Sequence, residues 1–120
     1  MGSTSAGEVV ESYRTALGSG EFATARKFMQ DNMTFQGPFD TFSTADQYLE
    51  ASRRLATIIQ RIDVKKVFID GDDACVLYDM VTNTPAGTAF IAEWYHVTGG
   101  KIAALRAVFD GRPFAAMFGG

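Results

Sequence analysis

The chain has 120 residues, of which 47% are hydrophobic and 21% charged, and its net charge is −3. This size and composition are typical of a single globular domain spanning residues 1–120. The mildly acidic charge argues against binding to nucleic acid or to an anionic membrane surface. No apolar stretch reaches the ~18 residues that a membrane-spanning helix needs, so a cytoplasmic location is expected.

The first helix is predicted from its capping signal. Ser5 and Glu8 have the spacing of a capping box, and Gly18 follows the last apolar position of the repeat. Tyr13 falls on the apolar face of this helix, whereas Arg14 is expected to point away from that face.

A second helix is predicted from Glu21 to about Gln30, followed by a short strand over residues 33–36 that Gly37 and Pro38 interrupt. Thr44 and Gln47 again have capping-box spacing, so the third and longest helix is expected to begin there.

After Asp63 the hydrophobic period changes to two, which predicts four strands joined by short turns. Residues 74–83 form one strand, and residues 89–112 form two more around a Gly-Gly turn. The apolar tail, residues 113–118, is expected to cover a pocket mouth or a subunit interface. Helices followed by antiparallel strands predict an α+β fold, with three helices packed in the concave face of a strongly curved, mainly antiparallel sheet around a cone-shaped cavity.

Glu93 is the one acidic residue in a strongly apolar strand, AFIAEWYHV. If Glu93 points inward, alternation assigns the faces of the neighbouring strands as well. The residues expected to line the cavity and contact a substrate are Phe35, Phe39, Tyr48, Leu55, Val76, Tyr78, Met80, Ile91, Tyr95, Leu105, Ala107 and Phe109. Such an apolar cavity with few polar groups is typical of a site for a small lipophilic molecule.

The opposite face of the sheet is also apolar and is expected to form a homodimer interface. Its members include Leu77, Trp94, His96 and Val108.

The segment AEWYHVTGGKIAALRAVFD resembles the recurring signature of the SnoaL-like, or ketosteroid-isomerase-like, superfamily, which has the nuclear-transport-factor-2-like fold. The resemblance covers nearly the whole chain and implies the same curved sheet and a dimer. The fold hosts isomerases, hydrolases, cyclases, dehydratases and non-catalytic binders, so the resemblance alone implies no single activity.

Ketosteroid isomerases supply one template for the site. The resemblance places their helix tyrosine on Tyr13 and their oxyanion-binding acid on Glu93. Their general base falls on Gly37, which has no side chain, and Asp40 is the nearest substitute.

The epoxide hydrolase of this superfamily supplies a second template. Its Asp-Arg-Asp arrangement falls near Met80 and Thr82 and on Ala107, so none of the three residues is kept. SnoaL-type cyclases, which use an acidic residue for proton transfer in an apolar cavity, are the nearest match.

The expected function is therefore cofactor-free acid–base chemistry of an isomerase, cyclase or hydro-lyase type on a small lipophilic substrate, with no metal. Glu93, Tyr13 and Asp40 are the predicted catalytic residues, with Glu93 a neutral proton donor if burial disfavours its charge. Each has a structural alternative: a cross-strand ion pair of Glu93 with Arg106 or Lys101, a core role for Tyr13, and a turn cap for Asp40. A non-catalytic ligand-binding or dimeric interaction domain is the alternative function.

Overall fold

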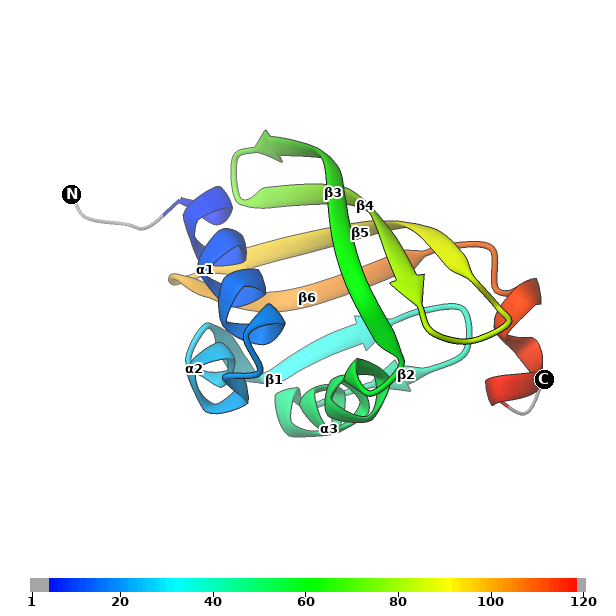
Figure 1. The fold of residues 1–120 in the computed structure, drawn as a ribbon. Coiled ribbons are helices and arrows are strands. Elements are labelled where there is room, and N and C mark those ends of the chain that lie inside the picture. The colour runs from blue at the N-terminus through cyan, green and yellow to red at the C-terminus, as the bar shows by residue number, and fades with distance from the viewer. Residues whose placement is uncertain (1–4, 119–120) are drawn as a thin grey trace.

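The computed structural model describes residues 5–118, which form three helices and one six-stranded sheet (Figure 1). The side chains of residues 116–118 lie outside this description. The helices are α1 (Ala6–Gly18), α2 (Phe22–Arg26) and α3 (Ala45–Ala56), and the strands are β1 (Met29–Gln36), β2 (Thr41–Phe42), β3 (Ile59–Asp70), β4 (Asp73–Thr82), β5 (Thr88–Thr98) and β6 (Lys101–Val108), with a closing 3₁₀ segment, η1 (Arg112–Phe118).

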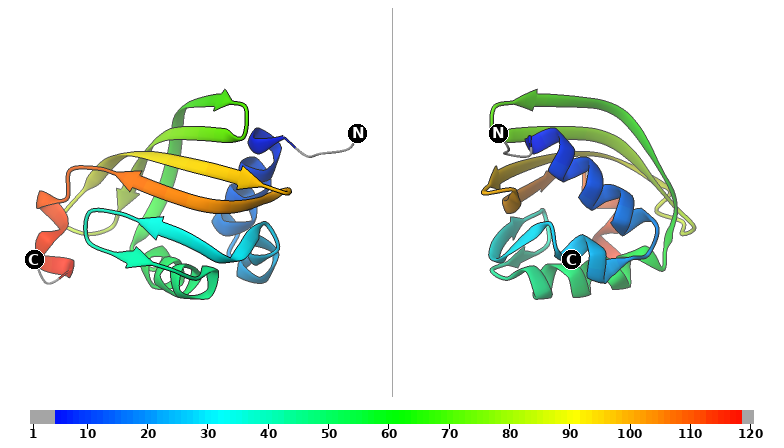
Figure 2. Two further views of the ribbon diagram at one scale, coloured as in Figure 1. Left: turned by 180° about the vertical axis from the view of Figure 1, so that it is seen from behind. Right: turned by 90° about the vertical axis from the view of Figure 1, so that its left-hand side faces the viewer.

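The strands are ordered β2-β1-β6-β5-β4-β3. The β1–β6 pair is parallel and the other four pairs are antiparallel, so the sheet is mixed. The predicted α+β class is confirmed, but the sheet is not strongly curled, and that part of the prediction is wrong. The helices lie on one side of the sheet (Figure 2).

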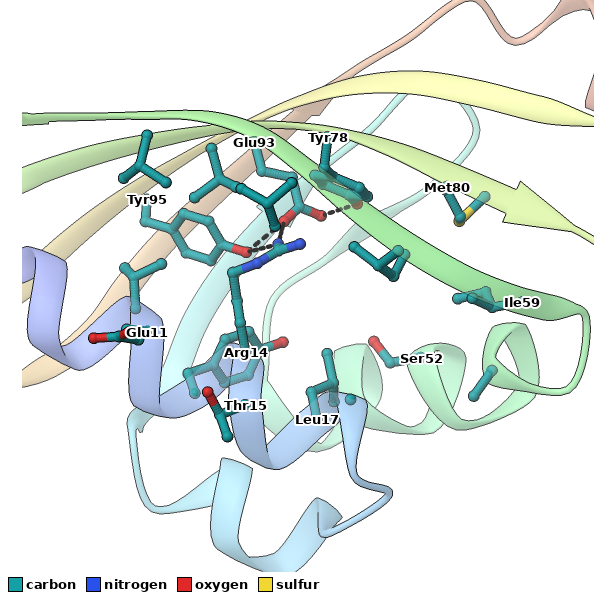
Figure 3. Close-up of a pocket in the computed structure, with 18 of the residues that line it drawn as sticks. Glu11, Arg14, Thr15, Leu17, Ser52, Ile59, Tyr78, Met80, Glu93 and Tyr95 are labelled. Atoms are coloured by element: carbon teal, nitrogen blue, oxygen red, sulfur yellow. Dashed lines mark hydrogen bonds and ion pairs between the residues drawn. The ribbon is translucent and has the colours of Figure 1, made fainter.

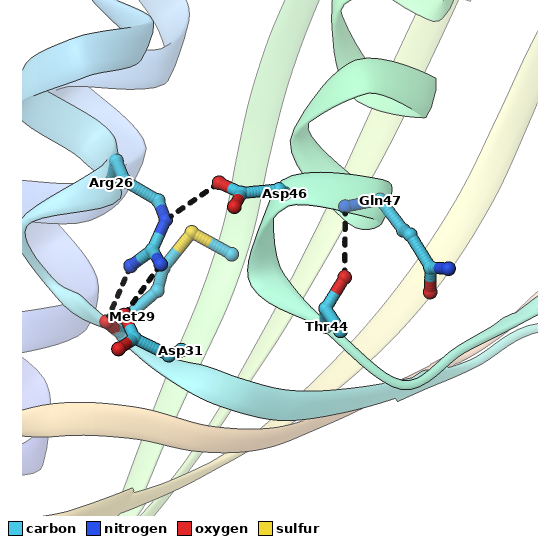
Figure 4. A network of polar contacts seen from close by, with 6 residues as sticks. All are labelled: Arg26, Met29, Asp31, Thr44, Asp46 and Gln47. Atoms are coloured by element: carbon cyan, nitrogen blue, oxygen red, sulfur yellow. Dashed lines mark hydrogen bonds and ion pairs between the residues drawn. The ribbon is translucent and has the colours of Figure 1, made fainter.

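Two helix starts follow the predicted capping signals. Glu8 N donates to Ser5 Oγ at 3.2 Å, and Ser5 N donates to Glu8 Oε1 at 3.1 Å, which completes the capping box of α1. Gln47 N donates to Thr44 Oγ1 at 3.2 Å at the start of α3 (Figure 4). The Gln47 side chain accepts instead from Ser43 N at 3.2 Å, so the second capping box is only half formed.

The second helix is much shorter than predicted, because Arg26 fastens the chain directly after it. Its guanidinium pairs with Asp31 at 2.6 Å and Asp46 at 3.0 Å, and it donates to the Met29 carbonyl at 3.1 Å (Figure 4). These bonds tie α2 to β1 and α3. As a result β1 already begins at Met29, where a helix to about Gln30 was expected.

Strands β4 and β5 alternate strictly between buried and more exposed residues. The inward set includes Val76, Tyr78, Ile91, Glu93 and Tyr95, as predicted, and all five are buried. The edge strand β3 is different: it begins four residues earlier than Asp63, and nearly all of its side chains are exposed.

None of the helices within the described residues is both long and apolar enough to cross a membrane.

Candidate functional site

The Glu93 side chain lies at the middle of β5, only 7% exposed, and is surrounded by hydrogen-bond donors (Figure 3). Arg14 Nη1 from α1 forms an ion pair with Oε1 at 2.6 Å. The Tyr95 hydroxyl donates to the same oxygen, and the Tyr78 hydroxyl donates to Oε2 at 2.9 Å. We call these four residues the Glu93 cluster.

This arrangement suits an ionised carboxylate, which accepts hydrogen bonds and donates none. It favours a charged Glu93 over the neutral donor expected from burial. The alternative of a cross-strand ion pair between Glu93 and Arg106 or Lys101 is wrong, because the cation that pairs with Glu93 is Arg14 of helix α1. Arg14 was expected to face away from the core and is instead the central donor of the site.

Electrostatics in the cluster act on Arg14 and on both tyrosines. Burial alone would lower the pKa of Arg14, but Tyr95, Glu93 and Tyr78 together raise it above its usual value. Burial, followed by the negative charge of Glu93, raises the pKa of Tyr95 and of Tyr78 well above the ordinary value. The arginine therefore stays charged and the tyrosines stay protonated donors.

The local sequence explains how the cluster forms. Glu93 is paired with Val76 on β4 and Ala107 on β6, and neither side chain offers it a polar partner. Helix α1 contacts β4 and β5, and Arg14 lies one turn after the buried Val10. The Arg14 guanidinium also stacks 4.4 Å from the Tyr78 ring centre. A buried acid whose strand neighbours offer no cation needs a partner from another element, but the sequence did not identify Arg14 as that partner.

Two cavities meet at this cluster. The larger, about 1030 Å³, lies between α1 and β3, and we call it the α1–β3 cavity (Figure 3). The smaller, about 480 Å³, lies between α3, the loop after β1 and η1, and we call it the phenylalanine cavity after its five phenylalanines, Phe35, Phe39, Phe42, Phe109 and Phe114. Both are lined by Tyr48, Ser52, Leu55, Tyr78, Met80 and Glu93.

The predicted contact residues divide between the cavities. Four of them line both: Tyr48, Leu55, Tyr78 and Met80. Val76 and Tyr95 line only the α1–β3 cavity, and five line only the phenylalanine cavity: Phe35, Phe39, Ile91, Ala107 and Phe109. Leu105 lines neither, because it is buried in the core, so its assignment to the pocket is wrong.

Tyr13 lies on the wall of the α1–β3 cavity and is 1% exposed. Its ring packs edge-on against Tyr95, with 6.2 Å between ring centres. Its buried hydroxyl has no hydrogen-bond partner within hydrogen-bonding geometry, although Tyr48 is near enough to influence it electrostatically. Burial raises the pKa of this phenol well above the ordinary value, so it remains a neutral donor.

Asp40 lies at the exposed side of the phenylalanine cavity, on the loop after β1. Gly37 N donates to the Asp40 carbonyl at 2.9 Å, so the backbone closes this turn. A Cβ on Gly37 would lie 2.8 Å from the Phe35 ring. The position that the family resemblance assigns to the general base is therefore occupied by the ring of Phe35.

The C-terminal tail covers part of the phenylalanine cavity, as predicted for a pocket mouth. Phe114 is buried, lines the cavity and packs edge-on against Phe109 with 6.2 Å between ring centres.

The outer face of β5 carries a second polar cluster. Trp94 Nε1 donates to Asp73 Oδ1 at 3.0 Å, and His96 Nδ1 lies 3.0 Å from the same oxygen. Trp94 is 52% exposed, and Phe90 and Val108 are exposed beside it. The predicted outward orientation is confirmed, and the expected dimer through this face stays a prediction.

Among residues 5–118 no three His, Cys, Asp or Glu side chains gather closely enough to hold a metal ion.

Comparison with known proteins places this geometry in a family. The model of the SnoaL-like domain matches residues 10–105. An NTF2-like protein of unknown function from Cytophaga hutchinsonii is 28% identical with a TM-score of 0.81, over 95% of this chain and 98% of that one. Comparison with curated proteins gives no match.

More distant structures share the fold. An epoxide hydrolase from M. tuberculosis, described as LEH-like, is 16% identical with a TM-score of 0.77, over 94% of this chain and 88% of that one. A candidate ketosteroid isomerase from Kribbella flavida is 11% identical with a TM-score of 0.74, over 85% and 75% of the two chains. At these identities the likeness concerns the fold alone.

Proposed function

The chain belongs to the SnoaL-like domain family, and on that premise we propose that it is an enzyme performing cofactor-free acid–base chemistry on a small lipophilic molecule. The observation that carries the proposal is the position of Glu93, whose carboxylate is buried, paired with Arg14 and part of the wall of both cavities. Reactions of the isomerase, cyclase and hydro-lyase types need a proton acceptor of this kind.

Glu93 Oε2 is the proposed proton acceptor. Oε1 already receives hydrogen bonds from Arg14 and Tyr95, whereas Oε2 receives one, from Tyr78. A carboxylate oxygen has two acceptor positions, so Oε2 keeps one for a substrate C–H or O–H. Glu93 thus takes the role of base in place of the expected neutral donor.

Tyr13 is the proposed donor to a substrate oxygen. Apart from its coupling to Tyr48, its buried hydroxyl meets no hydrogen-bond partner of good geometry among the described residues, and a carbonyl bound there would satisfy it. Hydrogen bonding to that oxygen would stabilise the negative charge that develops when Glu93 removes an α-proton. Asp40, at the exposed side of the phenylalanine cavity, is an additional proton carrier in this proposal.

Proton exchange tests the proposal without knowledge of the natural substrate. The protein is incubated with beta-tetralone in deuterium oxide, and loss of the α-proton signal is followed by NMR. We expect catalysed exchange, reduced by about 10²–10⁴-fold in Glu93→Gln, the usual contribution of a general base. Asp40→Asn, at the additional proton carrier, should reduce the exchange rate far less than Glu93→Gln does. Equal exchange rates for the wild type and Glu93→Gln would remove Glu93 from the mechanism.

A non-catalytic ligand-binding domain is the second candidate. It is favoured by the three donors that already hold the Glu93 carboxylate, as in a structural ion pair. Such a domain would bind beta-tetralone without exchanging its protons, and the same NMR experiment separates the two functions.

Two further expectations belong to this proposal. The exposed apolar groups around Trp94 and Val108 support a homodimer through the outer sheet face. Sedimentation should give twice the monomer mass, and Trp94→Ser should yield a monomer; a monomeric wild type would refute the interface. The cytoplasmic location stays a prediction.

A further inference from the structure

The edge strand β3 turns a row of aliphatic side chains toward the α1–β3 cavity without burying them. Ile62, Val64, Val67 and Ile69 all line this cavity, and they are 38% to 53% exposed. Apolar side chains that line a cavity yet stay this exposed are typical of a ligand-binding surface.

A break in the strand produces this row. The pairing of β3 with β4 shifts between Val64 and Lys66, so one extra residue enters the strand there. Without the shift, Val64 and Val67 would point to opposite faces. The irregularity brings both onto the cavity side, while Phe68 lies in the wall of neither cavity.

The strand is held apart from the helix along most of its length. At the start of α1, Gly7 permits close approach, since a Cβ there would lie 3.1 Å from Ile69 Cδ1. Beyond this point the helix and the strand are separated by the cavity of about 1030 Å³.

The two cavities differ in the shape of side chain that lines them. The phenylalanine cavity has flat rings on several sides, and Phe35 stacks with Phe42 at 5.9 Å between ring centres. The α1–β3 cavity has the rings of Phe22 and four tyrosines on its helix and inner-sheet sides, whereas its β3 wall is aliphatic apart from Gln60 and Arg61. Flat rings suit an aromatic or polycyclic group, and a branched aliphatic wall suits a flexible hydrocarbon chain.

We propose that the α1–β3 cavity holds the saturated hydrocarbon chain of a ligand whose ring occupies the phenylalanine cavity. The junction at the Glu93 cluster then receives a single oxygen function of that ligand. This inference rests on the proposed function, because it names the class of molecule on which Glu93 would act.

The charges at the junction favour a ligand whose oxygen group is uncharged. The positive charge of Arg14 is already compensated by Glu93. A ligand carboxylate would lie beside the Glu93 carboxylate, and like charges repel in a site this buried. Within the described residues, Arg14 Nε and Nη2 donate to no acceptor, and Tyr13 Oη is coupled to Tyr48 but makes no hydrogen bond of good geometry, so a carbonyl or hydroxyl oxygen would find donors.

Two phenols that differ only in their chain test the inference by isothermal titration calorimetry. We expect ortho-hexylphenol, whose hydroxyl lies beside its chain, to bind at least about tenfold more tightly than ortho-cresol, because each buried methylene contributes roughly 0.8 kcal/mol. Beta-naphthol, which has rings and no chain, is the probe for the phenylalanine cavity.

Variants of two adjacent β3 residues, Val67 and Phe68, test whether the hydrocarbon chain of the ligand lies in the α1–β3 cavity. Val67→Trp places a bulky side chain in the wall of the α1–β3 cavity and should weaken ortho-hexylphenol at least about fivefold while leaving beta-naphthol unchanged. Phe68→Trp, on the same strand outside both cavities, is the matched control and should change neither. Ala51→Trp, in the wall of the phenylalanine cavity, should weaken both probes.

Equal affinities for ortho-hexylphenol and ortho-cresol would overturn the inference, as would equal effects of Val67→Trp and Phe68→Trp. The outcome is separate from that of the exchange experiment: if Glu93→Gln exchanges protons as fast as the wild type but Val67→Trp still weakens only the chain-bearing phenol, the proposed chemistry fails and the chain site stands.

Discussion

Two carboxylates beside the same strand show how position decides what a polar group does. On the inner face of β5, Glu93 is buried and receives donors from two other elements as well as its own. On the outer face, Asp73 Oδ1 lies 3.0 Å from both Trp94 Nε1 and His96 Nδ1, and its carboxylate stays accessible to water. Water can replace any lost partner of Asp73, whereas Glu93 depends on its protein partners. A single substitution in the inner cluster is therefore expected to lower the free energy of unfolding much more than one on the outer face.

The sharpest test of this difference is removal of Arg14. Arg14→Met leaves the Glu93 carboxylate buried without its cation, and we expect a loss of about 3–5 kcal/mol in the free energy of unfolding. Urea denaturation at neutral pH measures it. The double variant with Glu93→Gln removes the uncompensated charge and should recover much of the loss; additive losses would show that the two residues do not interact.

Two tyrosines in contact with each other provide the next test. Tyr95→Phe removes a donor from the buried carboxylate and should cost about 1–3 kcal/mol. Tyr13→Phe removes a buried hydroxyl that is coupled to Tyr48 but makes no hydrogen bond of good geometry among the described residues, so the folded protein should lose little or no stability. If both variants lost the same stability, the assigned hydrogen bonds of Tyr95 would be wrong.

Alkaline pH should act on the inner cluster as well. The pKa values of Tyr95 and Tyr78 are raised in the folded protein, mainly by burial, above the ordinary 10.0. Their stabilising contribution is therefore complete below pH 10 and declines as the pH rises toward the folded-state pKa, by up to about 1.4 kcal/mol per pH unit for each tyrosine. Denaturation from pH 8 to 11 checks this, and the double Phe variant should show a shallower decline.

The smallest effect is expected on the outer face. Asp73→Asn removes the charge from an exposed cluster, and the free energy of unfolding at neutral pH should hardly change. A loss as large as that of Arg14→Met would contradict the contrast between the two faces.

Local rules were sufficient for much of the fold. The cap at Ser5 depends on residues three apart, and the shared face of Ile91, Glu93 and Tyr95 depends on strand alternation, so both could be predicted from short stretches, although alternation alone does not say which face is inward. The end of α2 could not, because Arg26 is held by Asp31 on β1 and Asp46 on α3. Contacts between distant segments override local propensity there.

The site shows the same division. The strand residues that line the cavities could be predicted from alternation, as Tyr78 and Ile91 illustrate. Arg14 could not, because its helical position is polar by pattern and its burial arises only from Glu93, 79 residues away in the sequence. The exposed row of aliphatic side chains on β3 could not be predicted either, because it depends on a register shift that alternation does not indicate.

The central claim is that Glu93 is an ionised carboxylate held by Arg14 at the junction of the two cavities. Infrared difference spectroscopy of the wild type against Glu93→Gln at neutral pH, with glutamate isotopically labelled, tests it most directly. We predict that the band lost in the variant is the asymmetric stretch of a carboxylate, and that the same band shifts in Arg14→Met. Loss of the carbonyl stretch of a protonated acid would contradict the claim.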